Sequence, residues 1–260
     1  MKSSTFKLAM IQMKVEGGQR KKNLHHAQEK IAEAAGNGAQ VVLLPEAMDL
    51  GWTHPAALDL AQAAANGETS QLLIHEAIKY GLYLCAGLIE KEERYIYNTA
   101  ILIDPQGQII LKHRKINELD IGRQYYTVGT DLTVCQTAFG KFGIIICADA
   151  KDPHLLQLLG KQKTSVVLSP CSWAVPADHD HKKTPYGQEW IDAYSPAAKE
   201  FSLWIAGCSN VGWMNDGPWK GYKGIGCSLI VDPHGQVAAQ GPYGAEADTI
   251  IYHTIIYEED

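Results

Sequence analysis

The sequence contains no run of about 18 apolar residues, which is the length that a helix needs to cross a bilayer. The first residues, MKSSTFKLAMIQMKVEGG, also lack the uninterrupted apolar stretch of a signal peptide, because Gln12 and Lys14 interrupt it. We therefore expect a protein with no membrane partner and a cytoplasmic location.

An excess of positive charge is also missing. The chain has 23 Lys and Arg residues against 29 Asp and Glu residues, which gives a net charge of −6. The KHRK run at residues 112–115 is too short to reverse this balance, so nothing in the charge indicates nucleic acid as a partner. The 260 residues, 46% of them hydrophobic, predict one globular domain over residues 1–260 with a sizeable core.

Cysteine pairs with metal-binding or redox spacing are absent too. None of the six cysteines stands in a CxxC or CxxH pattern, which excludes zinc-finger and thioredoxin-type sites. A long apolar chain without a secretory signal has no need of a disulfide framework, so we expect reduced thiols. The GxSxG, P-loop and GxGxxG patterns are missing, which removes the serine-hydrolase and nucleotide-binding classes. The cysteines are Cys85, Cys135, Cys147, Cys171, Cys208 and Cys227.

Strand and helix patterns alternate along the first part of the chain. We predict strands at residues 6–13 and 82–90, and a third within AQVVLLPEA (39–47) that Pro45 ends, where apolar residues run together. Between them, helical periodicity predicts helices over residues 21–35 and 68–80.

Two later segments resemble each other. Residues 99–109 (TAILIDPQGQI) and 227–237 (CSLIVDPHGQV) both place Asp-Pro-x-Gly between apolar runs, which is typical of a β-hairpin with a type I turn. The similarity reflects either an internal duplication or shared turn chemistry alone. The polar stretch at residues 176–189 predicts a surface loop or a lid.

Three ionisable or nucleophilic residues each stand at or near the end of an apolar run. They are Glu46 after VVLLP, Lys115 after IILKHR and Cys147 after FGIII. Taken singly, each has an ordinary structural explanation: a solvated loop residue, a charged edge strand and a buried thiol. Together they suit acyl-transfer chemistry, since a carboxylate can deprotonate a thiol and an ammonium can stabilise the oxyanion that forms after attack.

The sequence resembles the nitrilase or carbon–nitrogen hydrolase superfamily, in order, from about residue 7 to 237. The matching fragments are LAMIQM, GAQVVLLPEA, HRKIN, FGIIICADAKDP, VVLSPCSW, AAKEFSLWIAGCSNVG, ILIDPQG and GCSLIVDPHG. The resemblance implies a four-layer α-β-β-α sandwich, an α/β fold that assembles into homodimers or larger oligomers. It further implies that Glu46 is the general base, Lys115 the oxyanion-stabilising cation and Cys147 the nucleophile. The backbone N–H of Ala148 would complete the oxyanion site, and no metal or organic cofactor is expected.

Departures from the family pattern bear on the substrate. Cys147-Ala148-Asp149 is similar to the Cys-x-Asp triplet of amide-cleaving relatives. Lys151 stands where many relatives have Arg, and it is either a contact for a substrate carboxylate or a solvated lysine. The second active-site glutamate of many relatives has only Glu118 as a candidate, because NELDIGRQYY does not match cleanly. The common Glu-Asn pair is replaced here by Glu200-Phe201.

Two further features each have two interpretations. Trp173 either forms an aromatic wall of the pocket or packs in the core. His179 and His181, with neighbouring aspartates, fit an exposed polar loop better than a metal site, because no further ligand motif accompanies them.

The sequence therefore predicts a hydrolase that cleaves a small linear amide or carbamoyl compound through a cysteine thioester. Nitrile hydrolysis by the same site is one alternative, and amide transfer to another acceptor is a second. A non-catalytic member that binds a small ligand or a partner protein is a third.

Overall fold

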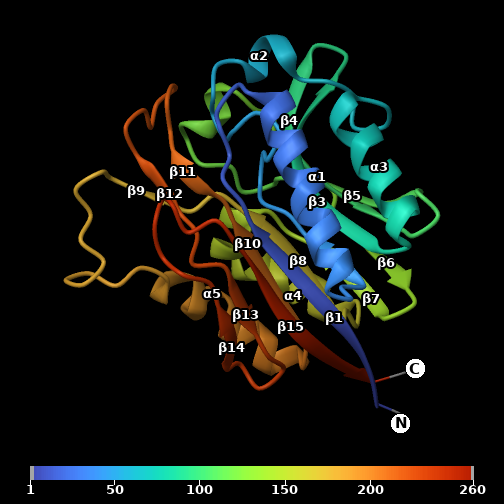
Figure 1. The fold of residues 1–260 in the computed structure, drawn as a ribbon. Helices are drawn as coiled ribbons and strands as arrows, with labels where there is room; N and C mark the ends of the chain where they lie inside the picture. Colours follow the sequence, from blue (N-terminus) through green and yellow to red (C-terminus); the bar gives the residue numbers. More distant parts are fainter. Residues whose placement is uncertain (1–2, 259–260) are drawn as a thin grey trace.

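The computed structural model describes residues 3–258, and two six-stranded sheets form its centre (Figure 1). The first sheet has the strand order β15-β1-β2-β3-β4-β5. Its strands are β1 (Ser3–Gln12), β2 (Val41–Leu43), β3 (Tyr83–Glu92), β4 (Tyr95–Ile103), β5 (Ile109–Arg114) and β15 (Thr249–Glu258). The first and last strands lie side by side, because β1 and β15 pair antiparallel along their whole length, with Ser3 opposite Glu258.

The second sheet has the order β14-β13-β10-β8-β7-β6. Its strands are β6 (Val134–Thr137), β7 (Gly140–Ile144), β8 (Val166–Cys171), β10 (Trp204–Ser209), β13 (Leu229–Val231) and β14 (Val237–Gln240). A small third sheet contains β9 (Ala174–Val175), β11 (Val211–Trp213) and β12 (Lys223–Ile225).

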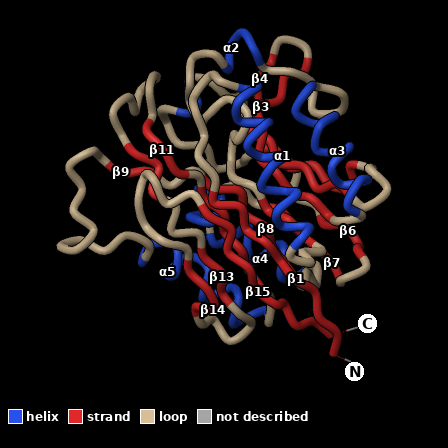
Figure 2. The backbone as a smooth tube through the Cα atoms, viewed as in Figure 1, coloured by secondary structure: helices blue, strands red, loops and turns tan. Residues whose placement is uncertain are grey.

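Helices cover the outer faces of both large sheets (Figure 2). Helices α1 (Arg20–Gly36) and α3 (Glu68–Tyr80) pack on the first sheet, and α4 (Pro153–Lys161) and α5 (Gln188–Phe201) pack on the second. The short helix α2 (Ala57–Leu60) and two 3₁₀ turns, η1 (Gly122–Gln124) and η2 (Cys147–Lys151), lie in connections. The molecule is therefore a mixed α/β sandwich with helices outside and two sheets inside. None of the helices within residues 3–258 combines the length and apolar character needed to cross a membrane.

Strand β1 shows why these residues build two cores. Successive side chains of a strand point to opposite faces of its sheet. Phe6, Leu8 and Met10 accordingly lie in the core between the sheets. Ala9 and Ile11 lie in the core beneath α1 and α3. The continuous apolar run in the sequence thus reflects a strand that is buried on both faces.

Most of the predicted elements are present, with shifted ends. The helix expected at residues 68–80 is α3, and the one expected at 21–35 is α1, longer by one residue at each end. The strand expected within residues 39–47 is β2, and it is shorter than expected, because it ends at Leu43 and the chain then bends through Pro45. Proline cannot donate to a sheet ladder, which is why the strand was expected to end there.

The two large sheets share one connectivity. In each, three parallel strands are followed by an antiparallel hairpin, and a further strand pairs antiparallel with the first of the three. Both predicted hairpins are present, as β4–β5 and β13–β14. Each has a register shift just before its Asp-Pro-x-Gly turn, after Leu102 in the first hairpin and after Ile230 in the second. Asp104 and Asp232 each accept backbone N–H groups two and four residues further on. Of the two explanations that the sequence leaves open, this shared topology favours internal duplication.

Candidate active site

Glu46 lies in the bend that follows β2, and its side chain is buried. Its backbone N–H donates to the carbonyl of Cys171 at 3.2 Å, which ties the bend to the end of β8. The bend also passes so close to β3 that a Cβ atom on Gly87 would lie 2.5 Å from the Cα of Glu46. Position 87 therefore needs glycine, and the close approach fixes the carboxylate at this end of the sheets.

The Lys115 ammonium lies between two buried carboxylates. Its Nζ is 2.8 Å from Oε1 of Glu46 and 3.2 Å from Oε1 of Glu118. Asn98 on β4 joins the same carboxylates, since its Nδ2 donates to Glu46 at 2.6 Å and to Glu118 at 3.2 Å. Burial alone lowers the pKa of Lys115, but the charges of Glu46 and Glu118 outweigh burial and raise this pKa well above its usual value. Lys115 is therefore a permanent cation.

Glu118, the second carboxylate beside Lys115, has a raised pKa. Burial disfavours its charged form and raises its pKa, while the Lys115 ammonium opposes the shift. Two carboxylates share one ammonium, so the fully ionised cluster carries an excess negative charge in a buried place. Such a cluster takes up one proton more easily than an exposed carboxylate does.

Cys147 is the first residue of the 3₁₀ turn η2, at the sharp bend that follows β7. Its φ angle is +46°, a left-handed conformation that non-glycine residues rarely adopt. Strain of this kind is found at active sites, where it presents a nucleophile at the end of a strand. The turn directs the thiol into the cavity that Glu46 and Lys115 also line.

Asp149 connects the turn of Cys147 to the segment that carries Lys115. Its carboxylate accepts the backbone N–H of Ile146 at 2.8 Å and those of Ile116 and Asn117 at 3.0 and 2.7 Å. His113 Nε2 lies 2.8 Å from the same carboxylate. Burial tends to raise the pKa of Asp149, but these hydrogen bonds and the imidazole hold it below its ordinary value. Asp149 is thus an ionised clamp between the two parts of the site.

The pKa of the Cys147 thiol is raised well above its usual value. The neighbouring Cys171 thiol and burial are the largest causes, the charge of Glu46 adds to them, and the Lys115 ammonium opposes them. Attack by this sulfur requires a base that removes its proton as the reaction proceeds.

Glu46, Lys115 and Cys147 line one cavity of about 110 Å³. At a more open part of the cavity, Lys151 Nζ lies 3.0 Å from Oε2 of Glu189, and each side chain is 47% exposed. The cavity thus contains a buried charged cluster and a solvated ion pair.

The remaining walls of this cavity are largely aromatic. Trp173 and Trp190 stack with ring centroids 4.8 Å apart, and Trp190 Nε1 donates to the hydroxyl of Tyr186 at 2.9 Å. Tyr186 belongs to the long connection between β9 and α5, which therefore forms part of the cavity rather than only a surface loop. Apolar walls and a small volume limit the site to a small molecule.

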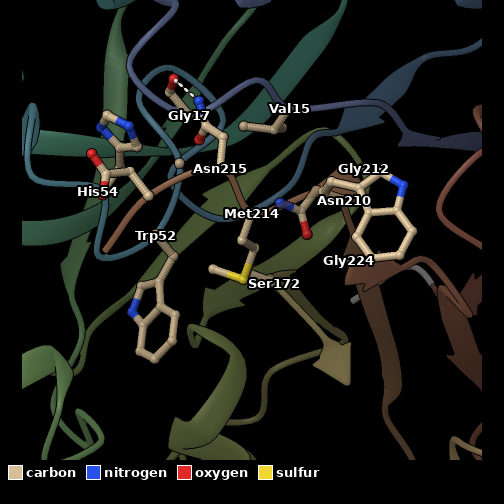
Figure 3. Close-up of a pocket in the computed structure, with 13 residues that line it drawn as sticks. Val15, Gly17, Trp52, His54, Ser172, Asn210, Gly212, Met214, Asn215 and Gly224 are labelled. Carbon is tan, nitrogen blue, oxygen red and sulfur yellow. Dashed lines mark hydrogen bonds between the residues drawn. The ribbon is translucent and has the colours of Figure 1, made fainter. Parts of the chain in front are cut away.

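A second, smaller cavity of about 20 Å³ adjoins the first, with Trp52 and Ser172 lining both (Figure 3). Figure 3 shows Met214 between Trp52 and Asn210. Asn215 Nδ2 donates to the carbonyl of Gly17 at 3.3 Å and closes this side. The space is enough for about one water molecule, so it extends the main cavity only slightly.

The other residues that the sequence predicted fall into three groups. Ala148, Lys151 and Trp173 line the main cavity. Glu118 contacts Lys115 from behind the cavity wall, and Glu200 lines a separate groove between α4 and α5.

The two histidines predicted in the exposed loop lie beside one tyrosine. His181 stacks on Tyr243 with ring centroids 4.0 Å apart, and the ring of His179 lies 6.1 Å from it. Within residues 3–258, no group of three or more His, Cys, Asp or Glu side chains is arranged to hold a metal ion.

Several residues of the site were not predicted. Asn98 is the one that the sequence could have indicated, because it is a polar residue inside the apolar strand YIYNTAILI. Glu189, Trp190, Trp52 and Trp219 come from connections and a helix whose approach to Cys147 has no local pattern.

Another buried carboxylate, Asp49, lies three residues beyond Glu46 and provides a test of the local electrostatics. Burial raises its pKa to about 6, although Arg20, the N–H of Ile89 and the hydroxyl of Thr69 oppose the shift. In the unfolded chain this pKa is about 3.9. Between about pH 4 and pH 6 the folded state therefore keeps a proton that the unfolded state has released.

We expect the free energy of unfolding to fall as the pH rises through this window, by roughly 3 kcal/mol from Asp49 alone. Asp49→Asn should remove that part of the pH dependence, which urea unfolding at several pH values measures. Asp59→Asn, at an exposed position on α2, is the matched control and should leave the slope unchanged. An unchanged slope in Asp49→Asn would contradict the assignment.

Sequence comparison decides the family. The profile of the family described as carbon-nitrogen hydrolase matches residues 7–258. The chain belongs to the carbon–nitrogen hydrolase family. Among curated relatives of this family, a nitrilase of Pyrococcus abyssi is 30% identical over 235 residues, covering 89% of this chain and 83% of that protein. An omega-amidase of Danio rerio is 28% identical over 268 residues, covering 97% of this chain and 88% of that protein.

Solved structures of carbon–nitrogen hydrolases have the same fold. A nitrilase-superfamily member of Saccharomyces cerevisiae has a TM-score of 0.82 at 24% identity, covering 96% of this chain and 89% of that one. A carbon–nitrogen hydrolase of Helicobacter pylori has a TM-score of 0.86 at 21% identity, covering 96% of this chain and 88% of that one. The family and the relatives make this chain a hydrolase of the amidase and nitrilase kind.

Proposed function

We propose that the protein hydrolyses a small linear amide or carbamoyl compound through a thioester on Cys147. The observation that carries the proposal is the cavity in which the paired Glu46 and Lys115 meet Cys147. A buried ion pair is costly to maintain without a function, and its position beside a strained cysteine suits catalysis better than ligand binding alone.

The first half of the reaction uses all three residues. Glu46 takes the proton of the Cys147 thiol, and the sulfur attacks the carbonyl carbon of the substrate. The Lys115 ammonium and the backbone N–H of Ala148 stabilise the oxyanion of the tetrahedral intermediate. When the intermediate collapses, protonated Glu46 returns its proton to the leaving group, and ammonia or an amine departs.

The second half releases the acid. Glu46, now a carboxylate again, takes a proton from a water molecule that attacks the thioester carbon. The sulfur leaves with that proton, which restores the thiol. In this scheme Glu118 does not meet the substrate. Its charge and that of Glu46 keep Lys115 protonated, and Asn98 holds both carboxylates in position.

An amide panel tests the proposal. Linear amides, carbamoyl compounds and nitriles of matched length are incubated with the protein, and released ammonia is measured. Intact-mass analysis after acid quenching identifies the acyl adduct, and peptide mapping locates it. We expect turnover of amides and an adduct on Cys147. An adduct on any other cysteine, or no turnover of the whole panel, would overturn the proposal. Hydroxamate formation with added hydroxylamine would instead indicate transfer to amines.

Lys151 is proposed to bind a carboxylate at the far end of such a substrate. It lines the cavity four residues after the nucleophile, and its charge is partly neutralised by Glu189 at 3.0 Å. Lys151→Met should raise KM for an ω-amide with a terminal carboxylate by about tenfold, or about 1.4 kcal/mol, with little change in kcat. Glu189→Gln should lower the same KM, because Lys151 is then free to pair with the substrate.

The neutral amide of equal length is the internal control for both variants, and its KM should not move. Equal changes for the neutral and the anionic substrate would show that the pair shapes the cavity rather than binds a carboxylate. Homodimer or larger assembly and a cytoplasmic location remain predictions.

A further inference from the structure

Cys171 stands opposite Cys147 at the ends of two paired strands. Strands β7 and β8 are parallel neighbours, with Ile144 opposite Leu168. Counting three residues forward from that pair reaches Cys147 on one side and Cys171 on the other. The backbone bond from Ile145 N–H to the Leu168 carbonyl, 3.2 Å long, continues the pairing beyond β7. Neighbouring strands lie about 4.8 Å apart, which is within the Cα separation of disulfides.

Both thiols belong to the core between the sheets. The Cys171 thiol is also the neighbour that contributes most to raising the pKa of Cys147. It donates to the Ser169 carbonyl at 3.2 Å and lies 3.7 Å from the Tyr194 hydroxyl, and these contacts fix its position at the end of β8.

Only one of the two sulfurs is open to a small molecule. Cys147 lines the main cavity, whereas Cys171 is fully buried and absent from the cavity wall. A small oxidant that enters the site therefore reacts at Cys147 first. A reactive cysteine with a second thiol in contact has the arrangement in which a sulfenic acid is captured as a disulfide.

The shared topology of the two sheets places Cys171 at a position equivalent to that of Glu46. VVLLPE at residues 41–46 and VVLSPC at residues 166–171 occupy equivalent strands of the two sheets. Cys171 thus stands in the second half where Glu46 stands in the first, and the backbone bond from Glu46 to Cys171 joins the two bends. The same architecture that directs Glu46 towards Cys147 directs Cys171 towards it.

We propose that Cys147 and Cys171 form a reversible disulfide after a hydroperoxide oxidises Cys147. In the first step the Cys147 sulfur attacks one peroxide oxygen and the O–O bond breaks. The sulfur is oxidised by two electrons to the sulfenic acid, and the thiol proton leaves with the second oxygen as water or alcohol. In the second step the Cys171 sulfur attacks the Cys147 sulfur. The S–S bond forms, and the sulfenic hydroxyl leaves with the Cys171 proton as water.

The disulfide would protect Cys147 from irreversible oxidation. Without Cys171, a sulfenic acid exposed to more peroxide advances to sulfinic acid, which thiols cannot reduce. With Cys171, the site stops at a disulfide that dithiothreitol reopens. The activity readout rests on the proposed function, but the cross-link itself does not, since peptide mapping detects it whether or not the protein turns over an amide.

The test uses the full-length reduced protein treated with hydrogen peroxide and then alkylated without reductant. Peptide mapping should find the peptide of Cys147 linked to that of Cys171, and the intact mass measured before alkylation should be lower than that of the reduced protein by two hydrogens. Turnover should be lost on oxidation and recovered with dithiothreitol. In Cys171→Ser, the same treatment should give sulfinic acid at Cys147 and a loss of turnover that dithiothreitol does not reverse.

Cys208→Ser is the matched control, because Cys208 is another buried thiol of the same core, and it should keep the cross-link. Sulfinic acid at Cys147 in the parent protein without a link to Cys171 would overturn the inference. A link from Cys147 to a different cysteine would do the same. The parent peptide map decides the question even if Cys171→Ser does not fold. A link formed in a protein that turns over no substrate would count against the proposed function and leave this inference standing.

Discussion

Cys147→Ser is expected to lower kcat/KM for the best amide by at least about ten-thousandfold. The hydroxyl has nearly the shape of the thiol, but it is a far weaker nucleophile and Glu46 cannot deprotonate it as readily. The left-handed backbone at this position is unchanged by the substitution, so the free energy of unfolding should stay within about 1 kcal/mol of the parent. Initial rates of ammonia release and a urea unfolding curve measure the two quantities.

Two observations would contradict this assignment. One is a Cys147→Ser protein that keeps a rate comparable to the parent. The other is an acyl adduct that forms on Cys171, whose sulfur lies beside that of Cys147. Cys208→Ser serves as the control for loss of a buried thiol, because the Cys208 sulfur donates to the carbonyl of Ile11 and lies outside the cavity wall.

Lys115→Met is expected to affect both the reaction and the fold. The substitution removes the cation that the oxyanion needs, which should cost at least about a hundredfold to a thousandfold in kcat. It also leaves Glu46 and Glu118 buried without their shared partner. Breaking a buried ion pair in this way typically costs about 3–5 kcal/mol of stability.

A double variant separates the two effects. Adding Glu118→Gln to Lys115→Met removes one of the stranded charges and should recover part of the lost stability, while turnover stays low. Urea unfolding of the parent, the two single variants and the double variant completes the thermodynamic cycle. A Lys115→Met protein with near-parental kcat would show that the ammonium has only a structural role.

Glu46, Lys115 and Cys147 each closely follow an apolar run, but so does Cys171, and the choice of these three positions came from the resemblance to the carbon–nitrogen hydrolase family. Buried strands that end at the same edge of a sandwich bring such residues together, and the cavity contains all three. Their catalytic roles stay a prediction until the variants are measured. The helices at residues 21–35 and 68–80 were predictable from the residues alone, since their periodicity is local.

The remaining features depended on contacts between distant segments. The strand predicted to end at Pro45 stops earlier, at Leu43, because an apolar run does not distinguish a strand from the buried bend that follows it. Glu118 was only a candidate, since its contact with Lys115 requires the turn after β5. The ion pair of Lys151 with Glu189 joins residues 38 positions apart on separate elements, for which a single sequence has no signal.

The duplicated sheets divide the chemistry unequally. Glu46 and Lys115 come from the first half of the chain, and Cys147 comes from the second. Under the proposed mechanism, a polypeptide that contained either half alone would be inert, because it would have an acid–base pair without a nucleophile or a thiol without a base. If the chain were severed in the connection between β5 and β6, turnover would depend on the two fragments finding each other.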